Sequence, residues 1–328
     1  MTDTQPVSKV PAVVGIDVGG TKSLGLVLDS SGEVVLQEKW PTPKGATEIV
    51  DTLAGLTKEL VERVADTHHI RGVGVGIAGL VDNEGRLRRA PNLIGSDEFA
   101  VRDLLEPVVA MPVFVDNDAN CAARAELHVG VAREVSHALL ITLGTGIGGA
   151  LVVNGQIDRG AAGMAGEPGH MMVDPQGPRC VCGQIGCWER YASGAGLAHL
   201  ARLAAESGAL ASVVEEVGSV AAIRGEHVTR SARLGDSDAA AVLETFARWV
   251  AIGMANCCAL LDPELIVVGG GLVRDWDLFG ERVVAHLDDV LVASEHRPQI
   301  RVRAATAGEA AGALGAAFLA AAETGVVR

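Results

Sequence analysis

The sequence predicts an α/β protein built of two lobes with a ligand-binding cleft between them. Strand and helix signals alternate over the first 120 residues, and the alternation starts again after Asp116. No long linker or low-complexity segment interrupts the 328 residues, a length that fits about two domains. We expect a smaller lobe formed by residues 1–117 and 309–328, and a larger lobe formed by residues 118–308.

The smaller lobe begins with apolar runs that are separated by short turns rich in glycine and polar residues. Such runs predict strands, and they lie at 10–18, 23–28, 34–40, 71–78 and 111–115. Apolar residues at helical spacing between 46 and 66 predict a helix before the fourth of these strands. Three hairpin-like strands followed by helix and strand units predict a mixed sheet.

The larger lobe is expected to contain more helix than strand. Helical patterns lie at 119–129, 196–207, 238–261 and 276–287. An alanine-rich helix at 308–324 closes the chain and falls almost entirely in the smaller lobe. Strands are expected at 137–143, 150–153, 265–268 and 299–303. A cysteine-containing loop, residues 166–190, follows the second of these strands.

The charge and the hydropathy pattern exclude several classes of function. A net charge of −14 argues against nucleic-acid binding, which needs clustered Lys and Arg, and more weakly against an anionic membrane surface. The first ten residues lack the apolar core of a signal peptide, and no apolar run is long enough to span a bilayer. Together with a cysteine cluster of metal-binding type, this predicts a protein of the reducing cytoplasm.

The most specific motif is the loop at 166–190, which carries four residues with the types and spacing of zinc ligands. They are His170, Cys180, Cys182 and Cys187. Three thiolates and one imidazole complete a tetrahedral zinc site and leave no open position, so the metal would be structural. Glu167 and Glu189 bracket the ligands, and a rigid loop would hold such groups at fixed geometry toward a substrate. The alternative is a chance cluster in an irregular loop.

A glycine-rich turn at 15–22 joins the first two expected strands. Glycine lets the backbone approach a ligand closely, and Thr21 and Lys22 can donate to phosphate oxygens. Asp17 could position a hydrated magnesium ion. The order Thr-Lys without a following helix excludes a P-loop. The alternative is an ordinary glycine-rich hairpin turn.

Two further glycine motifs follow buried strands. Residues 143–149 contain a literal GxGxxG, but a strand follows it, whereas a dinucleotide-binding fingerprint opens a helix. A second phosphate-binding hairpin with Thr145 at its tip fits better. A triple glycine at 269–271 ends a third strand, and its bare backbone could lie against a nucleotide base or ribose.

Asn117 and Asp118 lie where a strand changes to a helix, which is the ligand side of an α/β sheet. A carboxylate there can accept the proton of a substrate hydroxyl during phosphoryl transfer. Asp and Asn are also good helix N-caps, and from residue type alone the two roles are equally supported.

These motifs, in this order, resemble the ROK family of sugar kinases and repressors, and specifically its bacterial ATP-dependent glucokinases. The resemblance covers nearly the whole chain: the sequences GIDVGGTK and LGTGIGGA match the two phosphate motifs, VVGGGL the adenosine motif and GEPGH…CVCGQIGCWERYASG the zinc and substrate loop. It implies the two-lobed actin-like, ribonuclease H-like fold. It also implies transfer of the γ-phosphoryl of ATP, with Mg²⁺, to the 6-hydroxyl of glucose, and a dimer or tetramer.

The resemblance makes Asp118 the general base and His170, Cys180, Cys182 and Cys187 the ligands of a structural zinc ion. It assigns sugar contacts to Gly79, Asn92, Asn117, Asp118, Glu167, His170 and Glu189. It assigns nucleotide contacts to Asp17, Gly19, Gly20, Thr21, Lys22, Gly144, Thr145, Gly146, Gly269, Gly270 and Gly271. The sequence departs from the family pattern at Pro168, where an aliphatic residue is usual.

Three alternatives share these motifs. A kinase of N-acetylglucosamine, N-acetylmannosamine or another hexose would differ only in the shape of its sugar pocket. A sugar-responsive repressor would need an N-terminal DNA-binding segment, and only 14 residues precede Gly15. A kinase that uses polyphosphate would be expected to show a basic stripe, which is not evident.

Overall fold

The computed structural model describes residues 9–90, 93, 95 and 97–327, and it divides into two compact units. The first consists of the chain up to Glu134, the segment Arg159–Ala165 and the chain from Thr306 onward; the second consists of Val135–Asp158 and Gly166–Ala305. These boundaries differ from the expected ones after residue 117 and before residue 309. They differ because α3 (Asp118–His128) packs along α10 (Ala311–Thr324) of the first unit.

The first unit is built on a five-stranded mixed sheet, as the sequence predicted. Its order is β3 (Val34–Pro41), β2 (Lys22–Asp29), β1 (Val10–Val18), β4 (His68–Ile77) and β7 (Val113–Asn117). Strands β1, β4 and β7 run parallel, whereas β2 and β3 are antiparallel additions. A small hairpin of β5 (Leu80–Val81) and β6 (Leu87–Arg89) follows β4.

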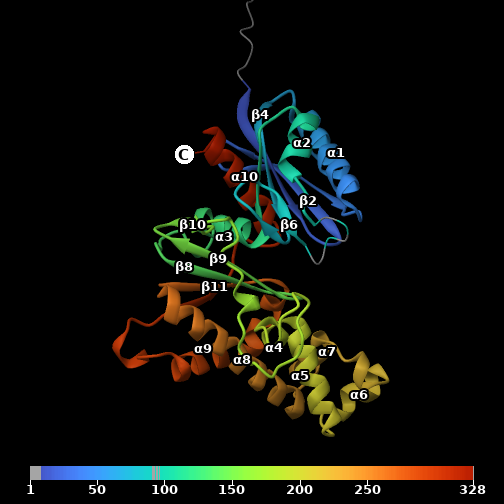
Figure 1. Cartoon of the computed structure of the whole chain (residues 1–328), viewed down its shortest axis with the longest axis vertical. Coiled ribbons are helices and arrows are strands. Elements are labelled where there is room, and N and C mark those ends of the chain that lie inside the picture. Colours follow the sequence, from blue (N-terminus) through green and yellow to red (C-terminus); the bar gives the residue numbers. More distant parts are fainter. Residues whose placement is uncertain (1–8, 91–92, 94, 96, 328) are drawn as a thin grey trace, which may run out of the picture. The chain divides into compact units, whose positions relative to one another are not determined.

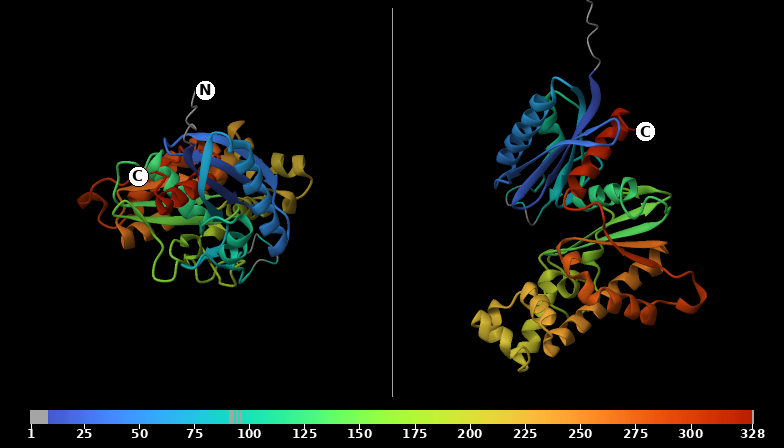
Figure 2. Two further views of the ribbon diagram at one scale, coloured as in Figure 1. Left: turned by 90° about the horizontal axis from the view of Figure 1, so that it is seen from above. Right: turned by 180° about the vertical axis from the view of Figure 1, so that it is seen from behind.

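Helices cover both faces of this sheet. Figure 1 shows α1 (Ala46–Val64) and α2 (Val101–Val109) on one face and α10 on the other, and Figure 2 shows the same arrangement from behind. The alanine-rich α10 lies very close to the strands. A Cβ on Gly74 of β4 would come within 1.8 Å of the Ala316 carbonyl oxygen. Small residues on both sides therefore allow this contact.

The second unit repeats the same sheet topology. Its order is β10 (Gln156–Asp158), β9 (Ile147–Val153), β8 (Ala138–Leu143), β11 (Leu265–Gly269) and β12 (Arg301–Ala304). As in the first unit, two antiparallel strands lie beside three parallel ones.

The helices of the second unit form a large apolar core with its sheet, around the fully buried Trp188 and Phe246. They are α4 (Glu189–Ala192), α5 (Gly194–Glu206), α6 (Ala211–Val217), α7 (Gly225–Arg233), α8 (Ser237–Leu261) and α9 (Trp276–Val290). Short stretches of 3-10 helix among the described residues are η1 (Pro168–His170), η2 (Val220–Ala222), η3 (Gly271–Asp275) and η4 (Ser294–His296).

Most expected elements are present, with ends that differ by a few residues. The helices α2, α6 and α7 were not expected; α2 carries Pro107, and α6 has seven residues. The second strand of the larger lobe begins at Ile147, immediately after its turn, rather than at residue 150. Within the described residues, every helix is too short or too polar to cross a membrane.

Candidate functional site

The parallel strands of the first unit bring several predicted site residues to one edge of the sheet. Asp17 pairs in register with Gly76, and Gly76 pairs with Asp116, so the carboxyl ends of β1, β4 and β7 are level. Gly79 follows β4, and Asn117 and Asp118 lie where β7 ends and α3 begins. Ligand-binding groups commonly gather at such an edge in α/β sheets.

The structure assigns the helix cap to Asn117. Its side-chain oxygen accepts hydrogen bonds from the amides of Ala119 and Asn120, at 2.8 and 3.1 Å, and its amide nitrogen donates to the Gly79 carbonyl at 2.9 Å. Asp118 is the first residue of the helix, and its carboxylate accepts a hydrogen bond from the Ala119 amide at 3.0 Å. Because Asn117 serves as the cap, the Asp118 carboxylate is not needed for that role.

The carboxyl groups of Asp118 and Asp17 are both harder to ionise than usual. Burial raises the pKa of Asp118, although the hydrogen bonds from Ala119 and Asn117 act in the opposite direction. Burial and the nearby Asp118 raise the pKa of Asp17 to about 7. The two carboxyl groups therefore influence each other, and a cation between or beside them would favour their ionised forms.

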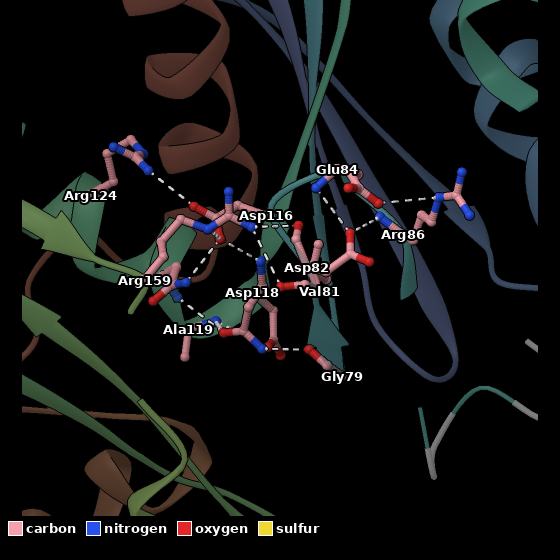
Figure 3. A network of polar contacts seen from close by, with 12 residues as sticks. Gly79, Val81, Asp82, Glu84, Arg86, Asp116, Asp118, Ala119, Arg124 and Arg159 are labelled. Carbon is pink, nitrogen blue, oxygen red and sulfur yellow. Dashed lines mark hydrogen bonds and ion pairs between the residues drawn. The ribbon is translucent and has the colours of Figure 1, made fainter. Parts of the chain in front are cut away.

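Asp116 organises the turn that carries these groups (Figure 3). Its carboxylate is 1% exposed and lies 3.1 Å from a nitrogen of Arg124 and 3.1 Å from Nε of Arg159. Its Oδ1 also accepts hydrogen bonds from the amide of Asn117 and the side chain of Asn120, both at 2.8 Å. One buried carboxylate thus connects β7, α3 and the segment that begins at Arg159.

The first glycine motif forms a hairpin between β1 and β2, as expected. The Gly19 amide donates to the Lys22 carbonyl at 3.1 Å, which closes the turn, and the side chains of Thr21 and Lys22 are exposed. This turn leaves backbone amides and two polar side chains available to a phosphate group.

The second and third glycine motifs lie together in the second unit. Gly144, Thr145 and Gly146 form the turn between β8 and β9, and the Gly144 amide donates to the Gly146 carbonyl at 3.0 Å. Since β8 and β11 are parallel, the triple glycine that ends β11 lies beside this turn. A Cβ on Gly270, which has a φ of +86°, would come within 2.5 Å of the Leu143 carbonyl oxygen.

The four expected metal ligands lie in one cluster. One ligand atom from each of His170, Cys180, Cys182 and Cys187 lies within 4.8 Å of the others. The Cys182 and Cys187 sulfurs are 3.5 Å apart, and the Cys180 sulfur is 3.7 Å from Nδ1 of the histidine. Zinc bonds of about 2.0–2.3 Å in a tetrahedron require ligand atoms about 3.3–3.8 Å apart. The donor set and the separations of 3.5 and 3.7 Å are therefore compatible with a zinc ion.

Main-chain and side-chain bonds hold this loop in shape. The Cys180 amide donates to the Gln184 carbonyl at 2.8 Å, around Gly183, which has a φ of +97°. The Tyr191 hydroxyl donates to Asp174 at 2.7 Å, and the indole of the buried Trp188 donates to the Trp249 carbonyl at 2.7 Å. The loop is thus attached to the helical core on its carboxyl-terminal side.

Glu167 and Glu189 lie next to the cluster. Oε1 of Glu189 accepts a hydrogen bond from the Cys180 thiol at 2.9 Å, and its Oε2 accepts one from the Ile147 amide at 3.4 Å. With Nδ1 facing Cys180, the other ring nitrogen of His170 lies 4.0 Å from Glu167. The geometry suits an imidazole that uses one nitrogen for a metal and the other for a polar partner.

Pro168 lies at the start of the short helix η1. It is buried and occupies the first position of η1, where the missing amide of proline costs no helical hydrogen bond. It packs against Gly149 of β9, where a Cβ would lie 2.5 Å from the proline ring.

The structure therefore forms two groups of predicted residues, one in each unit. Asn92 lies outside the described residues, so its predicted sugar contact has no structural description. Sequence reasoning overlooked Asp116 as an organising group, together with Arg124 and Arg159. Arg124 carries a usable signal, because it lies eight residues after Asp116 on an expected helix, whereas Arg159 carries none.

The fold, the glycine hairpins and the cysteine loop define a class of protein. The chain belongs to the ROK family, whose model matches residues 13–323. The fold class predicted from the sequence, α/β of the actin-like type, and the family resemblance are thereby confirmed.

Three relatives illustrate the range of the family. The chain is 37% identical to a glucokinase of Streptomyces coelicolor, over 94% of this chain and 96% of the relative. It is 37% identical to a ROK glucokinase of Streptomyces griseus whose crystal structure contains glucose and AMPPNP, with a TM-score of 0.79 over 94% of this chain and 98% of that one. It is 32% identical to an N-acetylmannosamine kinase of Citrobacter koseri, over 94% of this chain and 98% of the relative.

Proposed function

We propose that this protein transfers the γ-phosphoryl group of ATP to the 6-hydroxyl of glucose, with Asp118 as the general base. The observation that carries the proposal is the placement of Asp118 at the start of α3, where Asn117 supplies the cap and leaves the carboxylate for a substrate. The similarity to glucokinases over almost the full chain supports glucose as acceptor and ATP as donor.

In this reaction the protein's contribution is mainly positioning and electrostatic stabilisation. Asp118 accepts the proton of the sugar 6-hydroxyl while the oxygen of this hydroxyl attacks the γ-phosphorus. The bond between that phosphorus and the β–γ bridging oxygen breaks, which releases ADP. The raised pKa of Asp118 makes it a stronger base than an ordinary carboxylate once it is ionised.

The family resemblance assigns the contacts to the sugar ring to Gly79, Asn92, Asn117, Glu167, His170 and Glu189. The carboxylates accept hydrogen bonds from ring hydroxyls, and the imidazole exchanges one with them. These bonds orient the sugar and make the site selective for it.

The nucleotide is held by the glycine motifs. Amides of Gly19, Gly20, Gly144 and Gly146, with the side chains of Thr21, Lys22 and Thr145, contact the phosphates, and Gly269, Gly270 and Gly271 contact the adenosine. Asp17 would hold Mg²⁺, which would supply positive charge to the phosphates. Such a cation would also offset the effect of Asp118 on the pKa of Asp17.

A structural zinc ion bound by His170, Cys180, Cys182 and Cys187 keeps the substrate loop rigid. The thiolate ligands suit a reducing cytoplasm, and we expect the enzyme there as a homo-oligomer of two or four chains.

The test compares Asp118→Asn with Asp51→Asn, a matched change at an exposed residue of α1. In a coupled ADP-release assay with MgATP and glucose, loss of the base should lower kcat by about 100-fold or more. The Asp51 variant should keep the kcat of the wild type. A normal kcat in the Asp118 variant would show that another group accepts the proton.

The same assay decides which sugar is preferred. Glucose, N-acetylglucosamine, N-acetylmannosamine, mannose and fructose are compared by kcat/KM. We expect glucose to give the highest value. Preference for N-acetylmannosamine would assign the chain to the activity of its relative from Citrobacter koseri. Absence of turnover with every sugar would favour a sensor, like the xylose repressor of Bacillus subtilis, which is 28% identical to this chain.

A further inference from the structure

Arg159 contacts Asp116, next to the turn that carries Asp118, although the two residues are far apart in the sequence. It follows β10, which lies in the second unit, and it begins the segment Arg159–Ala165, which is part of the first unit. The chain then returns to the second unit at Gly166, one residue before Glu167.

The guanidinium of Arg159 connects three features around the start of α3 (Figure 3). Its Nε lies 3.1 Å from Oδ1 of Asp116, and its Nη2 donates to the carbonyl oxygens of Asp82 and Val81 at 3.0 and 3.4 Å. The same turn is bound from the other side, because Asn117 donates to the carbonyl of Gly79. These contacts therefore connect the end of β7 and the start of α3, where Asp118 lies, to the chain that follows β4.

The two oxygens of Asp116 have different partners. Oδ1 faces Arg159 and accepts the hydrogen bonds from Asn117 and Asn120 that shape the first turn of α3. Oδ2 accepts the hydrogen bond from Arg124, which lies further along the same helix. Arg124 already supplies a positive charge that balances the buried Asp116 carboxylate. We therefore assign a different role to Arg159, which is to fix Oδ1, the oxygen that accepts the hydrogen bonds of the turn.

The segment is also fastened beyond Arg159. Asn83 donates from its side chain to the Ala161 carbonyl at 3.0 Å, and a Cβ on Gly163 would lie 2.7 Å from the Asn83 amide nitrogen. Gly163 is buried and has a φ of +86°, so glycine is required for this close approach. The attachment thus extends from Arg159 to within four residues of Glu167.

We propose that Arg159 is a positioning residue for the phosphoryl transfer, which fixes Asp118 through Asp116 and the first turn of α3. The inference rests on the proposed function for its effect on the rate, and on the structure alone for its effect on the turn. Arg159 acts through Asp116 and the carbonyl groups of Val81 and Asp82, not by contact with the reacting atoms.

The test compares Arg159→Ala with Arg124→Ala, since both remove a guanidinium from the same carboxylate. We expect kcat with glucose to fall about 10-fold or more in the first variant, with little change in KM for MgATP, because a displaced base slows the chemical step. We expect a much smaller loss in the second. Millimolar guanidinium or methylguanidinium should restore part of the kcat of Arg159→Ala, since Arg159 is partly exposed and its removal leaves a space for the ion.

A purely structural role would give a different result. Destabilisation would lower the melting temperature of both variants, and guanidinium would not raise activity. Equal losses of kcat in the two variants without rescue, or a normal kcat in Arg159→Ala, would refute the proposal.

Hydrogen exchange of the peptide amides at 117–121 measures the turn without any sugar. We expect faster exchange in Arg159→Ala than in Arg124→Ala and the wild type. A wild type that phosphorylates no sugar would refute the proposed function, while this measurement would still decide whether Arg159 holds the turn. Unchanged exchange would refute the positioning role.

Discussion

Replacing Asp17 by asparagine should stabilise the ligand-free protein at alkaline pH. Burial and the neighbouring Asp118 raise the pKa of Asp17 from 3.8 to about 7. Between these two pH values the folded protein keeps a proton on Asp17 that the unfolded chain has lost. The contribution of this proton to the free energy of unfolding therefore falls as the pH rises, and it is fully lost above pH 7. Each pKa unit corresponds to about 1.4 kcal/mol, which gives a total of about 4 kcal/mol. This is an upper bound because the side chain retains some exposure.

The assay is urea unfolding of the wild type and Asp17→Asn at pH 4.5 and pH 8, without nucleotide or divalent cations. We expect the free energy of unfolding of the variant, relative to the wild type, to rise by about 2–3 kcal/mol between these pH values. The variant should at the same time lose activity with MgATP. A difference between the two proteins that does not change with pH would refute the reasoning.

Asp29→Asn provides a control of opposite sign. Burial opposes the ionisation of Asp29, but hydrogen bonds from the Ser31 hydroxyl and from the amides of Ser31 and Glu33 lower its pKa. Ionised Asp29 therefore stabilises the folded protein above its unfolded pKa, and this stabilisation is lost as the pH falls. Its substitution should reduce stability at pH 8.

Two further predictions concern the second unit. A Cβ on Gly146 would lie 2.5 Å from Oε2 of Glu189, whereas one on Gly144 would be 4.0 Å from its nearest neighbour. Gly146→Ala should therefore displace the carboxylate and raise KM for glucose several-fold in steady-state kinetics, and Gly144→Ala should leave that KM unchanged; equal values would contradict a sugar contact by Glu189. Cys182→Ser should lose the zinc that metal analysis detects in the wild type, since such sites contribute on the order of 10 kcal/mol of apparent binding energy, and Cys257→Ala in the apolar core should retain it. Active wild-type protein without zinc would exclude the metal site.

The sequence predicted those features in which local spacing carries the chemistry. The cysteine loop, the glycine turns and the change from strand to helix at Asn117 are each contained in at most 25 residues. The sheet was predictable for a similar reason, because buried strands and hairpin turns leave a short-range pattern. The competition between cap and base at 117–118 was not decidable from residue types, and only the hydrogen bonds of the Asn117 side chain resolve it.

The contacts that the sequence did not reveal join residues far apart in the chain. Arg159 and Asp116 are separated by 43 positions, and nothing in the neighbourhood of Arg159 distinguishes it from a surface charge. α2 was overlooked for a different reason. Its internal proline and short length hide a helical pattern that becomes stable only when its apolar side packs on the unit's core.

Near the carboxyl-terminal end of α3 another buried carboxylate, that of Glu126, joins segments that are far apart in the chain. Glu126 is 1% exposed, and its carboxylate accepts hydrogen bonds from the amides of Val131, Thr306 and Ala307 at 2.7–2.9 Å. These residues flank the points where the chain passes into the second unit after Glu134 and returns from it at Thr306. The helix therefore holds the chain near two of these passages through Glu126, while Asp116, one residue before its cap, holds a third through Arg159. Because Asp118 is the first residue of this helix, the proposed base lies on the element that these contacts fasten within the first unit.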